Sequence, residues 1–393
     1  MDKKLIKVLA HTVEPVHNFY KTQFSIKIPK VKYCYTFDSN KTRDSLVDSN
    51  NASALFSLKS IRRKIFNKLD PFDFLQLPKM KPISTDCDLI HMAGIIPITN
   101  SPWVVDFEDF SMFVGYQTKH LYSPQVKFLI QKCFSSKRCK RILPWTFAAK
   151  KGMEYYFAKA GLNKNILDKV EVVYPFTEPK KLKKKKSSVS KLFFIGKEFY
   201  LKGGIDVIES FLILRKRMDC ELTLISKIPK SVIDKYSDIK GLNLIQSGPL
   251  VSNSFIEDCY QSSDLFILPT HMDTLGFVIL EAMSYGLPIV SVNQFSVSEL
   301  VTNNGILVDN IFSIQENNLM RESFEYSLDY SKAYSPNKQY LIKLADACEK
   351  ILTNTSLRNK MGKNSLFEVE KGKFSKKKRV AALSKIYFDS LIN

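Results

Sequence analysis

The sequence has few glycines, and none of them forms the phosphate-binding fingerprint of dinucleotide enzymes. Only 14 of the 393 residues are glycine, and the first is Gly94. A Rossmann dehydrogenase carries Gly-x-Gly-x-x-Gly after a strand, and Gly196 followed by Gly203-Gly204 does not provide it. This absence argues against a nicotinamide-dependent oxidoreductase.

Cysteine pairs with metal-ligand or redox spacing are also lacking. The seven cysteines are odd in number and scattered, with no Cys-x-x-Cys, and Cys133 and Cys139 have no nearby histidine to complete a zinc set. We therefore expect reduced structural thiols in a cytosolic protein.

Long apolar runs are missing as well. A transmembrane helix needs about 18 consecutive apolar residues, and the run within residues 1–10 is too short and interrupted for a signal peptide. We expect a cytoplasmic protein whose membrane contact, if any, is peripheral and at the inner face.

What the chain does contain is enough apolar sequence for two domains. It is 45% hydrophobic and 12% aromatic, which excludes a disordered or fibrous chain. At 393 residues it is also longer than a single hydrophobic core supports, since cores stop growing near about 250–300 residues.

The net charge of +20 indicates an acidic partner or a highly soluble surface. The densest basic run, residues 180–186, has no interleaved aromatics and is followed by two serines. That composition is more typical of a solvated linker than of a nucleic-acid groove. A weak attraction to anionic lipid stays open.

Hydrophobic patterning divides the chain into two α/β halves. In the first half we expect strands at 4–10, 88–91, 103–107, 141–143 and 170–174 and a helix at 147–160. In the second half, strands at 192–195, 221–225, 242–245, 264–268 and 289–292 alternate with helices at 204–218, 254–262 and 276–285. Such alternation predicts a parallel sheet.

These patterns set the expected domain boundaries. They are an N-terminal Rossmann-like domain at 1–178, a Lys/Ser-rich linker at 179–190, a C-terminal Rossmann-like domain at 191–375, and a C-terminal helix at 376–393 that docks on a neighbouring element.

Residues 265–283 carry the strongest chemical signal. A buried strand ends at Pro269, and a loop leads into a helix that begins near Gly276. The positive end of this helix therefore lies at the carboxyl edge of a parallel sheet, where open α/β sheets bind ligands. Exposed amides of Gly276, Phe277 and Val278 are suited to hold a diphosphate there.

Two acids flank that helix start. Glu281 lies among apolar residues of the helix and needs a polar partner, and ribose hydroxyls are suitable donors to a fixed carboxylate. Asp273, eight residues earlier, can reach the sugar end of the same ligand. The alternative is that Glu281 pairs with a lysine and Asp273 caps the helix.

This stretch resembles the family-4 retaining glycosyltransferases with a GT-B fold (glycosyl transferases group 1). Their signature is an acid, seven residues and a glutamate within Pro-Ser/Thr-x-x-Glu-x-x-Gly-x-x-x-x-Glu-Ala. The sequence supplies Pro269-Thr270, Asp273, Gly276 and Glu281-Ala282. The resemblance covers residues 190–310, and it implies two Rossmann-like domains facing across a cleft. It makes 1–178 the acceptor-side domain and 191–375 the donor-binding domain, and it implies that the helix at 376–393 packs toward the N-terminal domain.

The resemblance also implies roles for individual residues. The second acid of the signature, Glu281, holds the nucleotide ribose, and the first, Asp273, contacts the donor sugar, although the family usually has glutamate there. Phe193-Phe194-Ile195-Gly196-Lys197 and Leu201-Lys202-Gly203-Gly204 resemble the family's phosphate clamp. Two such cations would neutralise the departing diphosphate, and the alternative for each lysine is a solvated side chain. The full donor set is Lys197, Lys202, Asp273, Leu275, Gly276, Phe277, Val278 and Glu281; the catalytic candidates are Asp273, Lys202 and Glu108.

Other segments depart from the family's pattern. His11-Thr12-Val13-Glu14-Pro15 stands where members usually have a glycine-rich loop, and Phe295-Ser296 replaces a Gly-Gly loop. The acceptor-side candidates are His91, at an Asp-x-x-His strand end, Glu108, where a histidine often lies beside the reacting sugar, and Asp109. A structural histidine and exposed loop acids are the alternatives.

The resemblance implies transfer of a hexose from a nucleotide-diphosphate sugar to an acceptor hydroxyl with retention of configuration. We expect a cell-envelope glycan or glycolipid acceptor in polysaccharide biosynthesis, no metal or other cofactor, and no nucleic-acid partner. The alternatives are a non-catalytic relative that binds a nucleotide sugar or a partner protein, and a basic polyanion-binding protein.

Overall fold

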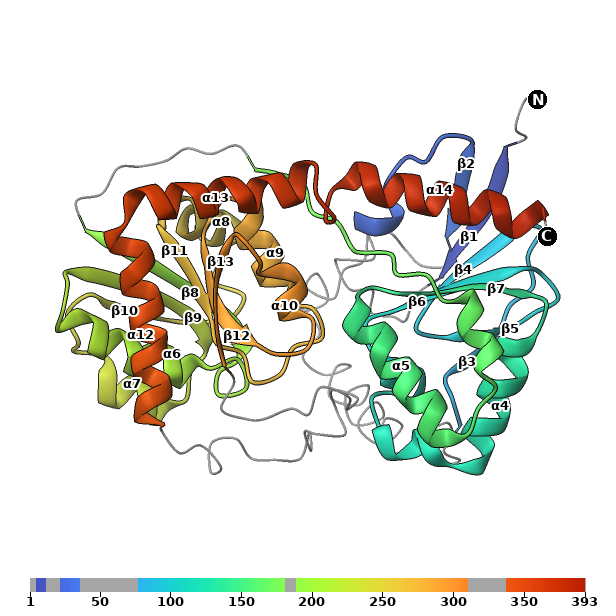
Figure 1. The fold of residues 1–393 in the computed structure, drawn as a ribbon, viewed down its shortest axis with the longest axis horizontal. Helices are drawn as coiled ribbons and strands as arrows, with labels where there is room; N and C mark the ends of the chain where they lie inside the picture. The colour runs from blue at the N-terminus through green and yellow to red at the C-terminus, as the bar shows by residue number, and fades with distance from the viewer. Residues whose placement is uncertain (1–4, 12–21, 36–76, 181–188, 310–336, 393) are drawn as a thin grey trace, which may run out of the picture. The chain divides into compact units, whose positions relative to one another are not determined.

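The structure is a computed structural model that describes residues 5–11, 22–35, 77–180, 189–309 and 337–392. Its internal contacts divide the chain into two units (Figure 1). Unit 1 contains Met1–Pro175 and Arg379–Asn393, and unit 2 contains Phe176–Glu316 and Ser323–Lys378. The expected linker at 179–190 lies mostly outside the described residues.

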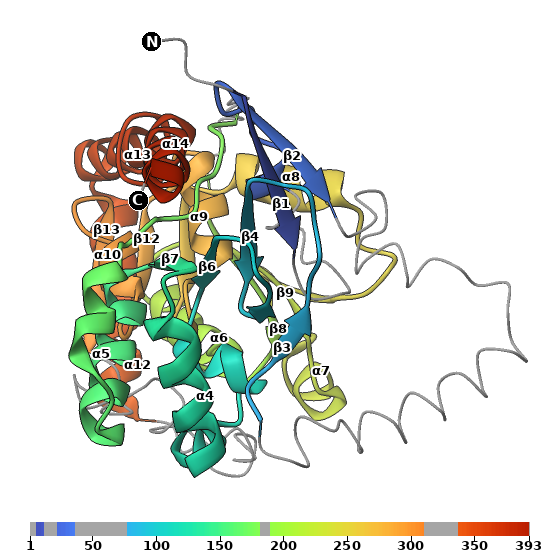
Figure 2. The same ribbon diagram turned by 90° about the vertical axis from the view of Figure 1, so that its right-hand side faces the viewer.

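Unit 1 is built on a five-stranded parallel sheet with the order β2-β1-β4-β6-β7. The strands β4 and β6 are buried along their whole length, as expected for a parallel sheet covered on both faces. Helices α4 and α5 pack beside it (Figure 2). The bounds are β1 Ile6–His11, β2 Val31–Tyr35, β4 Leu89–Ala93, β6 Trp103–Phe107, β7 Cys139–Pro144, α4 Pro124–Ser135 and α5 Phe147–Ala160, with a small pair β3 Met80–Pro82 and β5 Ile96–Ile98.

One predicted strand in unit 1 is wrong. Residues 170–174 run alongside β7 but form only an isolated bridge, from Val170 to Ile142. Glu171 N donates to Ile142 O and Val173 N to Pro144 O, each at 3.0 Å. The return bond of a parallel ladder would come from the amide of residue 144, and proline has no N–H to donate.

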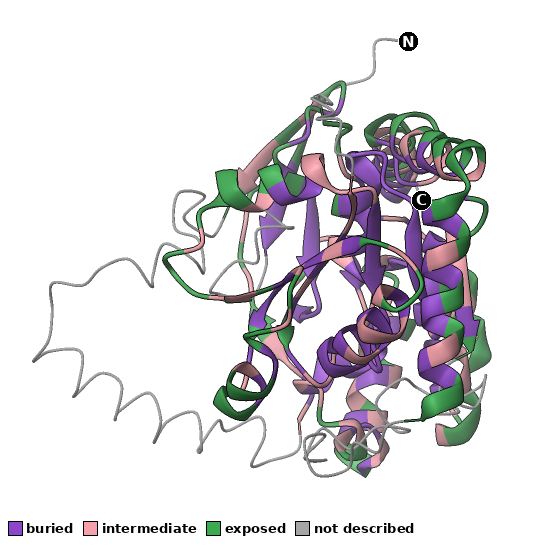
Figure 3. Ribbon diagram, turned by 90° about the vertical axis from the view of Figure 1, so that its left-hand side faces the viewer, coloured by how far each residue is buried: buried purple, intermediate pink, exposed green. Residues whose placement is uncertain are grey.

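Unit 2 is built on a six-stranded parallel sheet with the order β10-β9-β8-β11-β12-β13. Counted along the chain this is the order 3-2-1-4-5-6 of a doubly wound Rossmann fold. The central strands are buried and the covering helices expose their outer faces (Figure 3). The bounds are β8 Ser190–Glu198, β9 Cys220–Lys227, β10 Leu242–Gln246, β11 Leu265–Leu268, β12 Ile289–Asn293 and β13 Gly305–Asp309.

Helices cover both faces of this sheet. The connections β8–β9 and β9–β10 run through α6 Gly204–Arg215 and α7 Lys230–Tyr236, and those from β10 to β12 run through α8 Asn253–Ser262 and α9 Phe277–Ser284. Right-handed crossovers place the two pairs on opposite faces. Two helices that the pattern had not predicted extend the layers, since α12 Lys338–Thr353 packs on α6 and α13 Thr355–Glu370 on α9. The predicted α/β class with parallel sheets is confirmed in both units.

The last helix, α14 Lys376–Ile392, begins in unit 2 and is part of unit 1 from Arg379 onward. Its Arg379 guanidinium donates to Val173 O and Tyr174 O at 3.1 and 2.9 Å and lies 3.6 Å from the buried carboxylate of Asp106. Its Tyr387 hydroxyl lies 2.6 Å from His91 Nδ1. Removing the arginine would leave the buried Asp106 carboxylate without the cation that compensates its negative charge. This helix is therefore an integral part of unit 1.

No helix within the described ranges combines the length and the apolar character needed to cross a lipid bilayer.

Candidate donor site in unit 2

The candidate site lies at the carboxyl ends of β8 and β11, two adjacent strands from which the chain leaves in opposite directions along the sheet. Doubly wound sheets bind ligands at this kind of switch point. Lys197 lies near the carboxyl end of β8, the loop after β8 carries Lys202, and the loop after β11 carries Asp273. The structure therefore brings the predicted cations and the first predicted acid to one edge of one sheet.

Lys202 and Asp273 are in direct contact. Lys202 Nζ lies 2.8 Å from Asp273 Oδ2 and donates to Met272 O at 2.9 Å. Both side chains are less than a fifth exposed. An ammonium group has three donors. Among the described residues two acceptors engage it, which leaves the third donor for an incoming anion.

Close backbone packing explains the glycines beside Lys202. Gly203 has φ +77°, and a Cβ there would lie 2.3 Å from Pro269 O. A Cβ on Gly196 would lie 2.8 Å from Lys202 Cβ. Any side chain at these positions would push the two loops apart, so glycine permits the contact between Lys202 and Asp273.

Asp273 also caps the loop that follows it. Its Oδ1 accepts from Gly276 N at 2.9 Å and from Leu275 N at 3.4 Å. The helix cap considered as an alternative is not observed, because the N-cap residue of α9 is Gly276 and Asp273 bonds within the preceding loop. The Gly276 amide is accordingly engaged within the loop, and the Leu275 side chain is fully buried, so neither presents its expected group to a ligand in this arrangement.

Helix α9 begins directly after this loop. Gly276 is its N-cap with φ +85°, and Phe277 and Val278, both half-buried, open its first turn. The first amides of a helix have no acceptor inside it and carry the positive end of the helix dipole. These amides add positive potential to a corner where the charge of Lys202 is paired with Asp273.

Glu281 lies one turn further along α9, where the hydroxyl of Tyr260 from α8 is 3.0 Å from its Oε2. Its side chain is exposed, so a ligand can reach it, but many protein atoms surround the carboxyl and displace water from it. This desolvation raises the pKa of the carboxyl, and the Tyr260 hydrogen bond and the charge of Lys180 partly offset the rise. The expected pairing with a lysine is therefore only a distant electrostatic one, and Tyr260 is the direct partner.

Lys197 is exposed near the end of β8, three strand positions after Phe194. A phosphate group can therefore reach its ammonium group, although its position alone does not identify it as a phosphate ligand.

The acceptor-side candidates lie in unit 1, and only one of them is open to solvent. His91 is fully buried, between Tyr387 and the Asp106 carboxylate 3.6 Å away. Asp109 is 1% exposed and caps the short helix Phe110–Val114 through Ser111 N. These positions support structural roles for both residues, in place of the acceptor contacts proposed for them.

Glu108 is half-buried and follows β6 directly. The Tyr116 hydroxyl donates to its Oε1 at 2.5 Å. It remains the acceptor-side candidate that a ligand can reach.

The chain contains an Asp-x-Asp sequence, Asp86-Cys87-Asp88, of the kind that holds metal in GT-A enzymes. It precedes β4, and Asp88 Oδ2 accepts from Lys7 N at 2.8 Å. This contact ties the amino ends of β1 and β4 together. The pair therefore sits at the edge of the sheet opposite to the carboxyl ends.

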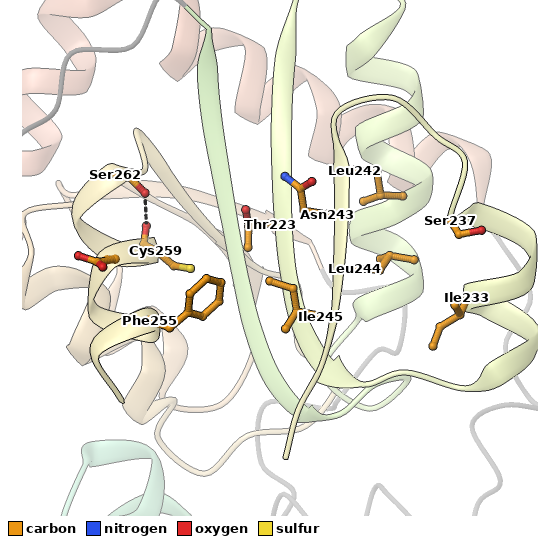
Figure 4. A pocket seen from close by; sticks show the side chains of 11 residues that line it. Thr223, Ile233, Ser237, Leu242, Asn243, Leu244, Ile245, Phe255, Cys259 and Ser262 are labelled. Atoms are coloured by element: carbon orange, nitrogen blue, oxygen red, sulfur yellow. Dashed lines mark hydrogen bonds between the residues drawn. The ribbon is translucent and has the colours of Figure 1, made fainter. Parts of the chain in front are cut away.

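Unit 2 also has a hollow of about 680 Å³ along its edge strand β10 (Figure 4). Figure 4 shows Phe255 and Cys259 of α8 on one side of the strand and Ile233 and Ser237 on the other. No predicted donor-site residue lines it, so it is separate from the candidate site.

Four supporting residues escaped prediction from the sequence. Tyr260 holds Glu281, Ser296 Oγ donates to Thr274 O at 2.6 Å, and the buried pair His271 and Asp206 joins the loop to α6 at 2.8 Å. Tyr260 belongs to the segment Tyr260-Gln261-Ser262-Ser263-Asp264 at the end of α8. The pairing of His271 with Asp206 has no signal in the sequence, because 65 residues separate them.

Part of unit 2 is similar in sequence to known glycosyltransferases. Residues 190–316 match the sequence model of the family described as Glycosyl transferases group 1. Over 109 residues the chain is 31% identical to a sulfoquinovosyl transferase of Arabidopsis thaliana, a match that covers 25% of this chain and 20% of the relative. The matched region thus spans about a fifth of that curated relative.

Solved structures extend the likeness over the whole chain. A glycosyltransferase from Rickettsia africae superposes with a TM-score of 0.60 at 14% identity, over 99% of both chains. Anabaena HepE, solved with UDP and glucose, superposes with a TM-score of 0.56 at 12% identity, over 99% of this chain and 100% of the other. At these identities the likeness shows the fold, which is the mixed α/β architecture of GT-B glycosyltransferases.

Proposed function

We propose that this protein is a glycosyltransferase that binds a nucleotide-diphosphate sugar at the carboxyl edge of the unit 2 sheet. The observation that carries the proposal is the contact between Lys202 and Asp273 at the start of α9. The group 1 match over residues 190–316 supports the activity class. HepE, which shares the fold, is described in complex with UDP and glucose, and this supports the class of donor.

In this proposal the diphosphate lies against Lys202 and the first turn of α9. The ammonium group donates its third proton to a phosphate oxygen, and the Val278 amide and the helix dipole add to the stabilisation. The exposed Lys197 joins them from the end of β8. Charge that develops on the departing diphosphate is thereby met by groups already in place, which lowers the barrier to cleavage.

Glu281 receives the ribose. A carboxylate that accepts from Tyr260 through one oxygen still has acceptor capacity for the two ribose hydroxyls. Because the Glu281 side chain is exposed, the ribose hydroxyls can reach its remaining acceptor positions.

The reaction we propose is transfer with retention and without a metal. The acceptor hydroxyl attacks the anomeric carbon on the face from which the diphosphate departs, the bond between that carbon and the phosphate oxygen breaks, and the hydroxyl proton passes to the leaving phosphate. Asp273 contacts the donor sugar through its Oδ2, because Oδ1 already accepts two loop amides. The donor sugar is a hexose.

On the acceptor side we propose Glu108 as the group that orients the acceptor hydroxyl, a role its hydrogen bond with Tyr116 would help to fix. The acceptor is a cell-envelope glycan or glycolipid in polysaccharide biosynthesis. The protein acts in the cytoplasm, with peripheral contact at the inner face of the membrane, to which the net charge of +20 contributes.

One observation favours a second candidate, a non-catalytic nucleotide-sugar binder. Asp273 is shorter than the usual glutamate and is held by Lys202 and by its own loop. Donor hydrolysis without an acceptor separates the two candidates, because a binder releases no nucleoside diphosphate.

The proposal is tested by a thermal-shift screen with UDP-, GDP- and ADP-glucose. We expect one nucleotide series to raise the melting temperature of the wild-type protein and to have no effect on Glu281→Ala. Glu299→Ala is the matched control, a half-buried acid elsewhere in unit 2, and should keep the shift. Equal shifts with single-stranded DNA, or a shift retained by Glu281→Ala, would favour the polyanion-binding alternative.

A further inference from the structure

A buried acid–imidazole pair lies directly beneath the candidate site. His271 Nε2 is 2.8 Å from Asp206 Oδ2, and the two side chains are 1% and 0% exposed. Asp206 is in the first turn of α6, four residues after Lys202, and His271 is two residues before Asp273. Each member of the pair is thus coupled through a short piece of backbone to one member of the Lys202–Asp273 contact.

Burying such a pair in the interior costs desolvation free energy, so its presence suggests that it has a role. Two polar groups lose their hydration there, and well-packed apolar residues of similar volume are often as stable or more stable. Neither side chain can reach a ligand, because both are enclosed by protein. Its use must therefore lie in what it holds in place.

The same loop is attached to α6 and its preceding turn at several points. His271 N donates to Leu201 O at 2.9 Å, and Pro269 O packs against Gly203 so closely that no Cβ fits between them. On the opposite side, with its amide oriented to satisfy both groups, Gln294 donates to His271 O at 3.2 Å and accepts from Asp273 N at 2.9 Å. His271 is the residue at which these attachments converge.

We infer that His271 and Asp206 are positioning residues, which lock the loop of residues 269–276 onto α6 so that Lys202 faces the diphosphate and Asp273 the donor sugar before the ligand binds. The inference rests on the proposed function for its consequence but not for its geometry. Preorganisation of this kind matters because charge-stabilising groups act fully only when no reorganisation is needed during the reaction.

The test uses a double variant, Asp206→Leu with His271→Leu, in the full chain. Replacing both partners leaves no unpaired buried charge, so the fold should survive. We expect the backbone amides of residues 270–276 to exchange hydrogen at least tenfold faster than in the wild type, while exchange in β9 and β12 is unchanged. Ser210→Ala, a buried change on the same α6 helix, should leave both regions unchanged.

A second readout separates positioning from stability. At saturating donor sugar, the double variant should release nucleoside diphosphate at least tenfold more slowly, with the KM for the donor changed less than threefold. His271→Gln retains a nitrogen donor and should recover part of both the rate and the exchange protection.

The outcomes distinguish this inference from the proposed function. If the wild-type protein neither binds nor hydrolyses any nucleotide sugar, the proposed function fails while the exchange measurement still decides the inference. Unchanged exchange in residues 270–276 of the folded double variant, or faster exchange throughout unit 2 to the same degree, overturns the positioning role. If the double variant does not fold, exchange in Asp206→Asn, which keeps the shape and removes the charge, decides in the same way.

Discussion

Lys202 Nζ and Asp273 Oδ2 lie 2.8 Å apart although 71 residues separate them in the sequence. The contact joins the loops that follow β8 and β11, the two strands at the switch point of the unit 2 sheet. It places one cation, one acid and one helix start in the same corner. The predictions below follow from that corner and from the residues that support it.

Lys202→Met should slow donor hydrolysis by about 100-fold or more, since removing one preorganised group that stabilises developing charge typically costs that much. The rate of nucleoside diphosphate release is the measurement. Lys216→Met is the control, an exposed lysine at the far end of the helix that follows Lys202, and should retain the wild-type rate. A Lys202→Met enzyme within threefold of the wild type would remove this lysine from the mechanism.

Tyr260→Phe should make donor binding more sensitive to acid. Burial raises the pKa of Glu281 and the Tyr260 hydrogen bond lowers it, so losing the hydroxyl raises the pKa further. The ribose contact needs the carboxylate, and donor affinity should therefore decline as pH falls through that pKa. We expect the midpoint of this decline to move to higher pH, because one hydrogen bond to the charged form is lost.

Calorimetric titration of the donor between pH 4 and 8 measures that midpoint. Tyr285→Phe is the matched control, because Tyr285 stacks on Tyr260 with ring centroids 5.0 Å apart but is not the hydroxyl beside Glu281. A shift of equal size in both variants would contradict a specific role for Tyr260.

Because His11 is buried in unit 1, the free energy of unfolding should decrease in acid. Burial, with a contribution from Lys81, lowers its pKa from 6.5 to about 4. Between these values the unfolded chain binds the proton and the folded chain does not, so the stabilisation is complete above pH 6.5 and is lost as pH falls toward 4. The loss amounts to at most about 3 kcal/mol.

Urea unfolding at pH 7 and pH 4.5 checks this prediction. The decrease in the free energy of unfolding should be smaller in His11→Gln than in the wild type. His120→Gln, a half-buried histidine of the same unit, should behave like the wild type. An equally steep decrease in His11→Gln would show that other groups govern the acid response.

Phe295 has φ +41°, a left-handed conformation that is costly for a residue with a Cβ. Phe295 and Ser296 occupy the position at which the glycosyltransferase family that this sequence resembles has a Gly-Gly loop. Phe295→Gly should be more stable than Phe295→Ala by about 1 kcal/mol, because both lose the ring and only alanine keeps the strained Cβ. At Asn293, an exposed strand position with ordinary backbone, alanine should be at least as stable as glycine. If glycine and alanine variants ranked in the same order of stability at both positions, the backbone at Phe295 would not be strained.

The α/β class and most of unit 2 were predictable because their signals are local. Alternating strands and helices follow from hydrophobic period, and α14 was expected at its observed bounds. The signature around Asp273 and Glu281 was also local, and it led to the corner where the structure places Lys202. The interpretation of residues 170–174 as a strand failed on a single missing amide in the neighbouring strand, at Pro144.

What could not be predicted depends on contacts between distant segments. The burial of His91 follows from the docking of Tyr387, 296 residues later. The partner of Glu281 comes from α8, and that of His271 from α6. For Asp273 the sequence suggested a ligand contact or a helix cap, and neither predicts its bonds to Lys202 and to the loop amide of Gly276, which depend on the folded positions of these neighbours.

The most direct test of the account is a crystal structure of the protein with the nucleoside diphosphate that gives the largest thermal shift. We predict a phosphate oxygen within hydrogen-bond distance of Lys202 Nζ and of the first amides of α9, with the ribose hydroxyls on Glu281. A nucleotide bound in the hollow along β10, or one whose phosphates leave Lys202 paired only with Asp273 and Met272, would contradict the account.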